Sequence, residues 1–109
     1  MGIKSIMPTC KNECYLCGRY ISAYARHEHH IFHGTANRKI SEREGLKVWL
    51  CPYCHEALHD HNEKDLELMQ DAQRVWEANY IKTYPYENHA EQVAREAFRK
   101  LFGKSYIYD

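Results

Sequence analysis

Hydrophobic residues follow two different spacings in this chain, and the spacing changes near residue 61. Before that point they occur in short runs, and we expect a first strand near 29–30 and a second strand over 47–50. Beyond it they recur every three or four residues, which is typical of amphipathic helices. The pattern predicts a small α+β domain in which two short strands and a helix precede two packing helices.

The helix of the first half is predicted from Pro52 to His59, because no helix breaker interrupts this run. Between the two strands, residues 34–39 (Gly-Thr-Ala-Asn-Arg-Lys) are predicted to form a polar loop. Ser41 fits the cap of a short turn that runs through Gly45.

Two longer helices are predicted in the second half. Asn62 fits the N-cap of the first, because Asp65 falls at its third position and acidic side chains favour a helix N-terminus. Residues 83–86 break this helix, and Asn88 starts a final one that ends at Gly103. The apolar stripes expected to pack these helices are Leu66, Met69, Ala72, Trp76 and Tyr80 in the first, and Val93, Ala94, Ala97, Phe98, Leu101 and Phe102 in the second.

The composition adds few constraints. A chain of 109 residues with 44% hydrophobic and 28% charged residues is expected to form one domain, residues 1–109. We see no apolar run of about 18 residues and no signal-peptide pattern, so we expect a cytoplasmic protein without a membrane partner. The net charge is zero, which excludes steering to polyanions by a global field, but residues 19–50 carry a net +3 and residues 55–79 a net −5.

Potential metal ligands are concentrated in the first half: seven of the eight histidines and four of the five cysteines lie between positions 14 and 61. Cys14 and Cys17 form one Cys-x-x-Cys pair, and Cys51 and Cys54 form another. Two such pairs supply the four thiolates of a closed tetrahedral zinc site. We therefore expect a structural Zn²⁺ that staples a core of residues 14–61, followed by a helical part of residues 62–109.

Two other interpretations of the cysteines stay open. A redox dithiol would need a strand-helix-strand pattern around one pair, and two matched pairs fit that interpretation poorly. The fifth cysteine, Cys10, either substitutes for Cys14 or is a free thiol.

The histidines suggest a second, open metal site. His55 and His59 are spaced i and i+4, so on a helix their imidazoles lie on one face. The His29-His30 doublet is placed to supply a third ring, although neighbouring residues of a strand point to opposite faces. His27 and His33 are expected to lie on the surface or to support the ligands, and His61 and His89 are expected to be plain surface histidines.

These residues resemble the HNH endonuclease motif of the ββα-metal superfamily: His29-His30, a loop, the strand Val48-Trp49-Leu50, and Cys51-Pro52-Tyr53-Cys54-His55-x-x-x-His59. Two Cys-x-x-Cys pairs (zinc knuckles) bracket this motif, as in small phage and prophage HNH proteins. Residues 29–34, 37–42 and 102–106 are also similar to segments of those proteins. The resemblance covers residues 14–61 specifically and the C-terminal helices more weakly. It implies a ββα-metal (HNH) core with a structural zinc site, and metal-dependent hydrolysis of phosphodiester bonds in DNA.

The resemblance also implies roles. His30 matches the general base, and His29, His55 and His59 match the ligands of a catalytic divalent ion, for which Mg²⁺, Mn²⁺, Ni²⁺ and Zn²⁺ are all expected to serve. Either Arg38 or Lys39 would hold the phosphate, with bidentate geometry favouring Arg38. A homodimer is the expected assembly if the substrate is duplex DNA.

One position departs from the family pattern. The middle Asn of the motif usually precedes the second strand, where this chain reads Gly45-Leu46-Lys47, and the nearest Asn upstream is Asn37. Either Asn37 serves from another loop, or the constellation is altered and activity is weaker. The alternative function is a non-catalytic zinc-binding module that binds DNA or a protein partner.

Overall fold

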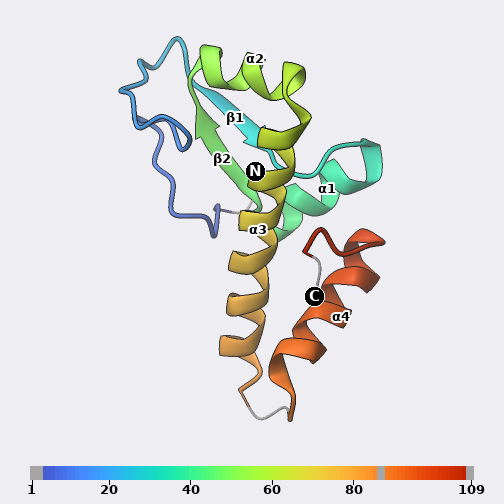
Figure 1. The fold of residues 1–109 in the computed structure, drawn as a ribbon. Helices are drawn as coiled ribbons and strands as arrows, with labels where there is room; N and C mark the ends of the chain where they lie inside the picture. The colour runs from blue at the N-terminus through green and yellow to red at the C-terminus, as the bar shows by residue number, and fades with distance from the viewer. Residues whose placement is uncertain (1–3, 86–87, 108–109) are drawn as a thin grey trace.

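The computed structural model describes residues 4–85 and 88–107, and within them it forms a small α+β fold. A two-stranded sheet is covered at one end by α2, and the long helix α3 continues from α2 and runs beside α4 (Figure 1). No helix of the described part is long and apolar enough to cross a bilayer. The elements are β1 (His27–His30), α1 (Thr35–Glu44), β2 (Lys47–Leu50), α2 (Pro52–Asp60), α3 (Asn62–Thr83) and α4 (Ala90–Phe102).

The register of the hairpin decides which histidines share a face. Strands β1 and β2 are antiparallel, with His29 opposite Val48 and His30 opposite Lys47. Because side chains alternate along a strand, His27 and His29 point to one face, and Glu28 and His30 to the other. The His29-His30 doublet is therefore divided between two environments.

The predicted loop at 34–39 is wrong, and so is the short turn capped by Ser41. Helix α1 occupies this segment, since no breaker lies between Gly34 before it and the left-handed Gly45 after it (φ 73°). Its exposed face is polar, which made a helix resemble a loop. Ser41 is buried inside α1, where its hydroxyl accepts a hydrogen bond from the backbone N–H of Phe32 (3.1 Å).

The stripe predicted for α3 is partly wrong. Ala72 and Trp76 are buried as expected, but Leu66 is 36% exposed and Leu68 is buried instead. Helix α3 contacts both α2 and α4, so its buried positions do not follow one stripe. In α4 the predicted Ala94, Phe98 and Phe102 are all buried. The helix starts fall within two residues of the predicted ones, with His61 and His89 as the N-caps.

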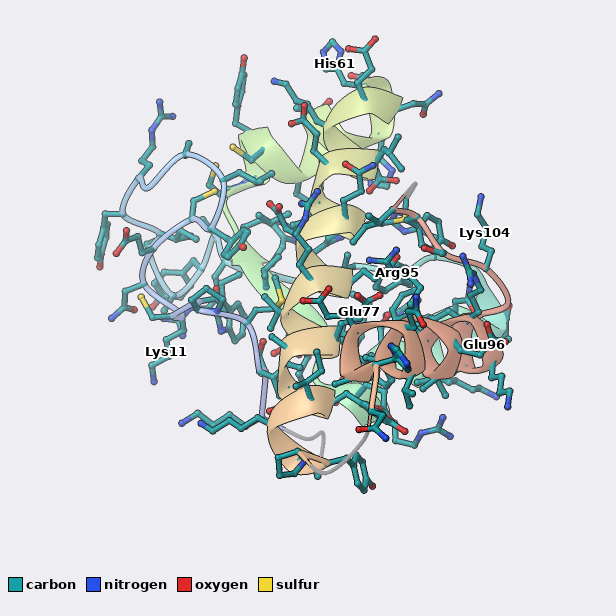
Figure 2. The ribbon with its side chains drawn as sticks, turned by 60° about the horizontal axis from the view of Figure 1, so that its bottom comes forward. Lys11, His61, Glu77, Arg95, Glu96 and Lys104 are labelled. Atoms are coloured by element: carbon teal, nitrogen blue, oxygen red, sulfur yellow. The ribbon has the colours of Figure 1, made fainter. Side chains whose placement is uncertain are left out.

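A buried ion pair joins the two long helices. Arg95 donates from Nε to Oε2 of Glu77 (2.7 Å) and from Nη2 to Oε1 (3.2 Å), and both side chains are mostly shielded from solvent. Figure 2 shows the two side chains meeting between α3 and α4. Gln73 donates to the same carboxylate (2.7 Å) and accepts from the backbone N–H of Tyr106 (2.8 Å). The network fastens the residues after α4 to α3.

Replacing Arg95 with methionine should leave the Glu77 carboxylate buried without its cationic partner. We expect Arg95→Met to lower the free energy of unfolding by about 3–5 kcal/mol, measured by urea denaturation. The matched control is Arg74→Met, whose partner Asp71 lies on the surface (side chains 59% and 53% exposed), so the loss should be about 0–1 kcal/mol. Equal losses in the two variants would contradict this account.

Candidate metal sites

The four predicted cysteines converge. Their Sγ atoms all lie within 4.8 Å of one another, in the set Cys14, Cys17, Cys51 and Cys54. The Sγ atoms of Cys17 and Cys51 are 3.9 Å apart. A tetrahedral zinc site with Zn–S bonds of about 2.3 Å has edges of roughly 3.8 Å, so this spacing suits the ion. The arrangement is compatible with a structural zinc site, as predicted from the sequence.

Local backbone geometry places both cysteine pairs. After Cys17 the left-handed Gly18 (φ 74°) turns the chain, and its N–H donates to the carbonyl of Cys14 (2.9 Å). Cys51 is the N-cap of α2, and its sulfur accepts from the N–H of Cys54 (3.4 Å). Pro52 fits the first helical position because that position needs no N–H donor. Cys10 is exposed and lies outside the cluster.

The electrostatics of the cluster call for a cation. Burial opposes ionisation of Cys14, but backbone hydrogen bonds from Cys51, Cys17 and Leu16 lower the pKa of its thiol to about 7. Burial raises the pKa of Cys54, and hydrogen bonding to the three other sulfurs raises it further. Ionisation of all four thiols would therefore need a positive charge among them, which a zinc ion would supply.

The histidines gather at a second place, between β1 and α2. The ring centroid of His29 lies 5.4 Å from those of both His33 and His55, and the rings of His55 and His59 are 5.2 Å apart. His27 stacks on His55 at 4.8 Å with 6° between the ring planes. The sheet, the loop after β1 and the start of α2 thus supply imidazoles to one cluster.

His29 is the buried member of this cluster. It is 6% exposed, and its Nε2 has no hydrogen-bond partner among the described residues. Burial lowers the pKa of His29 to about 3, and the neighbouring rings of His33, His55, His59 and His30 lower it too. A neutral imidazole with a buried, unpaired nitrogen is costly unless it has a ligand, and it is in the form that binds metal.

A cavity of about 500 Å³ connects the histidines to the first helix. Arg38 lies at its wall on α1, beside the predicted base His30. A neighbouring depression is formed by His30, Thr35, Arg38, Lys39 and Glu42. Asn37 is half-buried on α1 and is not among the residues that line the cavity. The histidines that line the cavity are His27, His29, His30, His33, His55 and His59.

His30 belongs to a polar network on the other face of the sheet. Its Nε2 lies 2.8 Å from Oε1 of Glu42, and Nζ of Lys47 lies 2.7 Å from Oε2 of the same carboxylate. These hydrogen bonds, first that of Lys47 and then that of His30, lower the pKa of Glu42 to about 2. Glu28 completes the group at 3.7 Å from Lys47. The buried ammonium of Lys47 offsets one of the two carboxylate charges.

Sequence reasoning missed two neighbours of His29. Nε2 of His33 lies 2.9 Å from each carboxylate oxygen of Asp65, a residue of the first turn of α3. One ligand atom from each of His29, His33 and Asp65 falls within 4.8 Å of the others. In the sequence, Asp65 was explained as an acidic residue that favours the N-terminus of a helix. Nothing in the neighbouring residues indicated its contact with His33.

Comparison with known proteins yields no match: no family model fits the chain, and no curated protein or solved structure is significantly similar to it. The function is therefore inferred from the geometry of the two clusters.

Removing the metal should unfold the N-terminal half. We expect one zinc ion per chain to co-purify, held tightly by the cysteine cluster. A strong chelator should abolish the cooperative thermal transition seen by circular dichroism. Structural zinc binding of about 10–16 kcal/mol in finger peptides indicates why the loss should be severe.

The cysteine that lies outside the cluster is the matched control. Cys51→Ser should lower zinc content and thermal stability, whereas Cys10→Ser should change neither. A chelated protein with an unaltered melting temperature would refute the structural role of the ion.

Proposed function

We propose that the protein is a divalent-metal-dependent endonuclease of the HNH type that hydrolyses phosphodiester bonds in DNA. The observation that carries the proposal is the buried Nε2 of His29, which has no hydrogen-bond partner in the described part of the chain and lies at a cavity that is also lined by His30, Arg38, His55 and His59. Histidine rings suit Zn²⁺, Ni²⁺ and Mn²⁺, and such an ion would stabilise the charge that develops on the phosphate oxygens. In this proposal His29, His55 and His59 hold the ion.

His30 is the general base in this proposal, and Glu42 fixes its tautomer. An ionised carboxylate can only accept hydrogen bonds, so Nε2 of His30 donates to Glu42. Nδ1 then carries the lone pair that removes a proton from the attacking water. Glu42 thus takes the positioning role that the resemblance leaves to Asn37, which does not line the cavity.

Arg38 is the phosphate-binding residue of the proposal. Its exposed guanidinium lies on the cavity wall one helical turn from Glu42, and two parallel N–H donors match two phosphate oxygens. Lys39 lines the adjoining depression and extends the positive surface. The net +3 of residues 19–50 favours contact with a DNA backbone on this side.

A non-catalytic zinc module that binds DNA is the second candidate. The observation that favours it is a set of highly exposed tyrosines near the two knuckles in sequence, Tyr20 (74%), Tyr24 (101%) and Tyr53 (74%). Exposed aromatic rings stack on bases without any catalytic requirement. Metal stoichiometry separates the candidates, because the module needs only the zinc of the cysteine cluster.

A plasmid-nicking assay tests the catalytic proposal. With Mg²⁺, Mn²⁺ or Ni²⁺ added to zinc-loaded protein, we expect supercoiled DNA to be nicked. Loss of a general base should slow nicking by His30→Ala about 10²–10⁴-fold while circular dichroism is unchanged. His61→Ala changes an exposed histidine outside the cavity and serves as the control. Equal rates for wild type and His30→Ala would exclude His30 as the base.

Glu42→Gln tests the positioning role. We expect kcat to fall at least about tenfold with little change in KM, because the phosphate contacts of Arg38 are untouched. The loss of charge also leaves Lys47 with less compensation, so stability should fall. The double variant Glu42→Gln/Lys47→Met removes that second effect: it should recover stability but not kcat. Recovery of both would make Glu42 a purely structural residue.

A further inference from the structure

We infer that the divalent ion of the histidine cluster is bound on the α3 side of His29, by His29, His33 and Asp65, and so ties helix α3 to the sheet. The inference rests on the proposed function for the presence of a second ion, and assigns that ion a ligand set that shares His29 with the set named there but has His33 and Asp65 in place of His55 and His59 as the principal ligands. Neither His33 nor Asp65 belongs to the ligands that the HNH resemblance implies.

The distances suit adjacent ligands of one ion. His33 Nε2 lies 2.9 Å from both oxygens of Asp65. Two ligands at 2.0–2.1 Å from an ion, at a right angle, are about 3.0 Å apart. The ligand atoms of His29, His33 and Asp65 all lie within 4.8 Å of one another, so one ion can contact the three with small side-chain adjustments.

His29 supplies the independent sign of a ligand. Its side chain is more than nine-tenths buried, faces this cluster, and has an Nε2 without a hydrogen-bond partner among the described residues. Native proteins rarely leave such a nitrogen unpaired. Two imidazoles and one carboxylate form a common donor set for catalytic zinc and other divalent ions, and they leave positions open for water or substrate.

The other close sets of ligand atoms in the described part of the chain are already accounted for. The four cysteines form the zinc cluster. In the set of Glu28, His30 and Glu42, the buried ammonium of Lys47 lies 2.7 Å from one carboxylate and 3.7 Å from the other. A second cation there would be repelled by this ammonium, which already occupies the space between the carboxylates. The set around His29 has no such internal cation.

This ligand set makes the ion a link between three segments. His29 belongs to β1, His33 to the loop after it, and Asp65 to the first turn of α3. His55, whose ring lies 5.4 Å from that of His29, is placed to add a ligand from α2. Binding of the ion should therefore raise the thermal stability of the zinc-loaded protein as well as create the reactive site.

Cobalt binding tests the inference without any nuclease assay. Zinc-loaded protein is titrated with Co²⁺ by calorimetry, and the visible absorption of the bound cobalt reports its ligands. The wild type should bind one Co²⁺ in addition to zinc. Asp65→Asn and His33→Asn should each weaken that binding at least tenfold and abolish the cobalt-dependent rise in melting temperature, whereas Asp65→Glu, which keeps a carboxylate, should retain measurable binding.

The matched controls are one aspartate and one histidine of helix α3 and its N-cap that lie outside the inferred ligand set. Asp71→Asn on the exposed face of α3 and His61→Asn at its N-cap should bind cobalt as the wild type does. Melting temperatures of the cobalt-free proteins show that each variant is folded.

The outcomes distinguish this inference from the proposed function. If the wild type binds no second ion, both fail. If the wild type binds cobalt and both Asp65→Asn and His33→Asn bind it equally tightly, the ligand set inferred here is wrong, and loss of binding in His59→Ala would then support the set named for the proposed function. Weakened binding in both variants, with unaltered controls, supports the inference.

Discussion

The convergence of four cysteine sulfurs is the constraint on which the other features of the site depend. Zinc in this cluster would close a loop of 33 residues between Cys17 and Cys51, and that loop contains both strands and the first helix. Cys51 is also the N-cap of α2, so the same cluster fixes where that helix begins. The direction of α2 in turn sets the faces of His55 and His59. The cysteine cluster therefore orients two rings of the histidine cluster, those of His55 and His59.

The pleat of β1 places the neighbouring side chains of His29 and His30 in different surroundings. His29 points toward α2, where its Nε2 has no hydrogen-bond partner within residues 4–85 and 88–107, while His30 points toward α1 and bonds to Glu42. The proposed function needs one ring with an unoccupied nitrogen for the metal and one ring with a fixed tautomer to remove a proton. The alternation of side chains along β1 puts two neighbouring rings in these two environments. The doublet, which looked crowded in the sequence, therefore places one ring in the histidine cluster and the other beside Glu42, and both rings line the same cavity.

Local signals made part of this structure predictable. Both strands, helix α2 and the cysteine cluster follow from patterns within a few residues, and the structure has them where they were expected. Helix α1 was missed because its exposed polar face resembles a loop. Asp65 and Glu42 were missed for a different reason: each meets its histidine only through tertiary packing, 32 and 12 residues away in the sequence. The predicted roles of His55 and His59 as ligands stay predictions.

The C-terminal helices contribute to the site through the residue next to His33. Phe32 is fully buried, and its ring lies 4.5 Å from that of Phe102 and 5.6 Å from that of Phe98. Because Phe32 and His33 are adjacent, α4 fixes the backbone from which His33 reaches Asp65 on α3. The two helices thus act on the loop after β1 from two directions, one through apolar packing and one through a carboxylate. The C-terminal helices are therefore part of what shapes the histidine cluster.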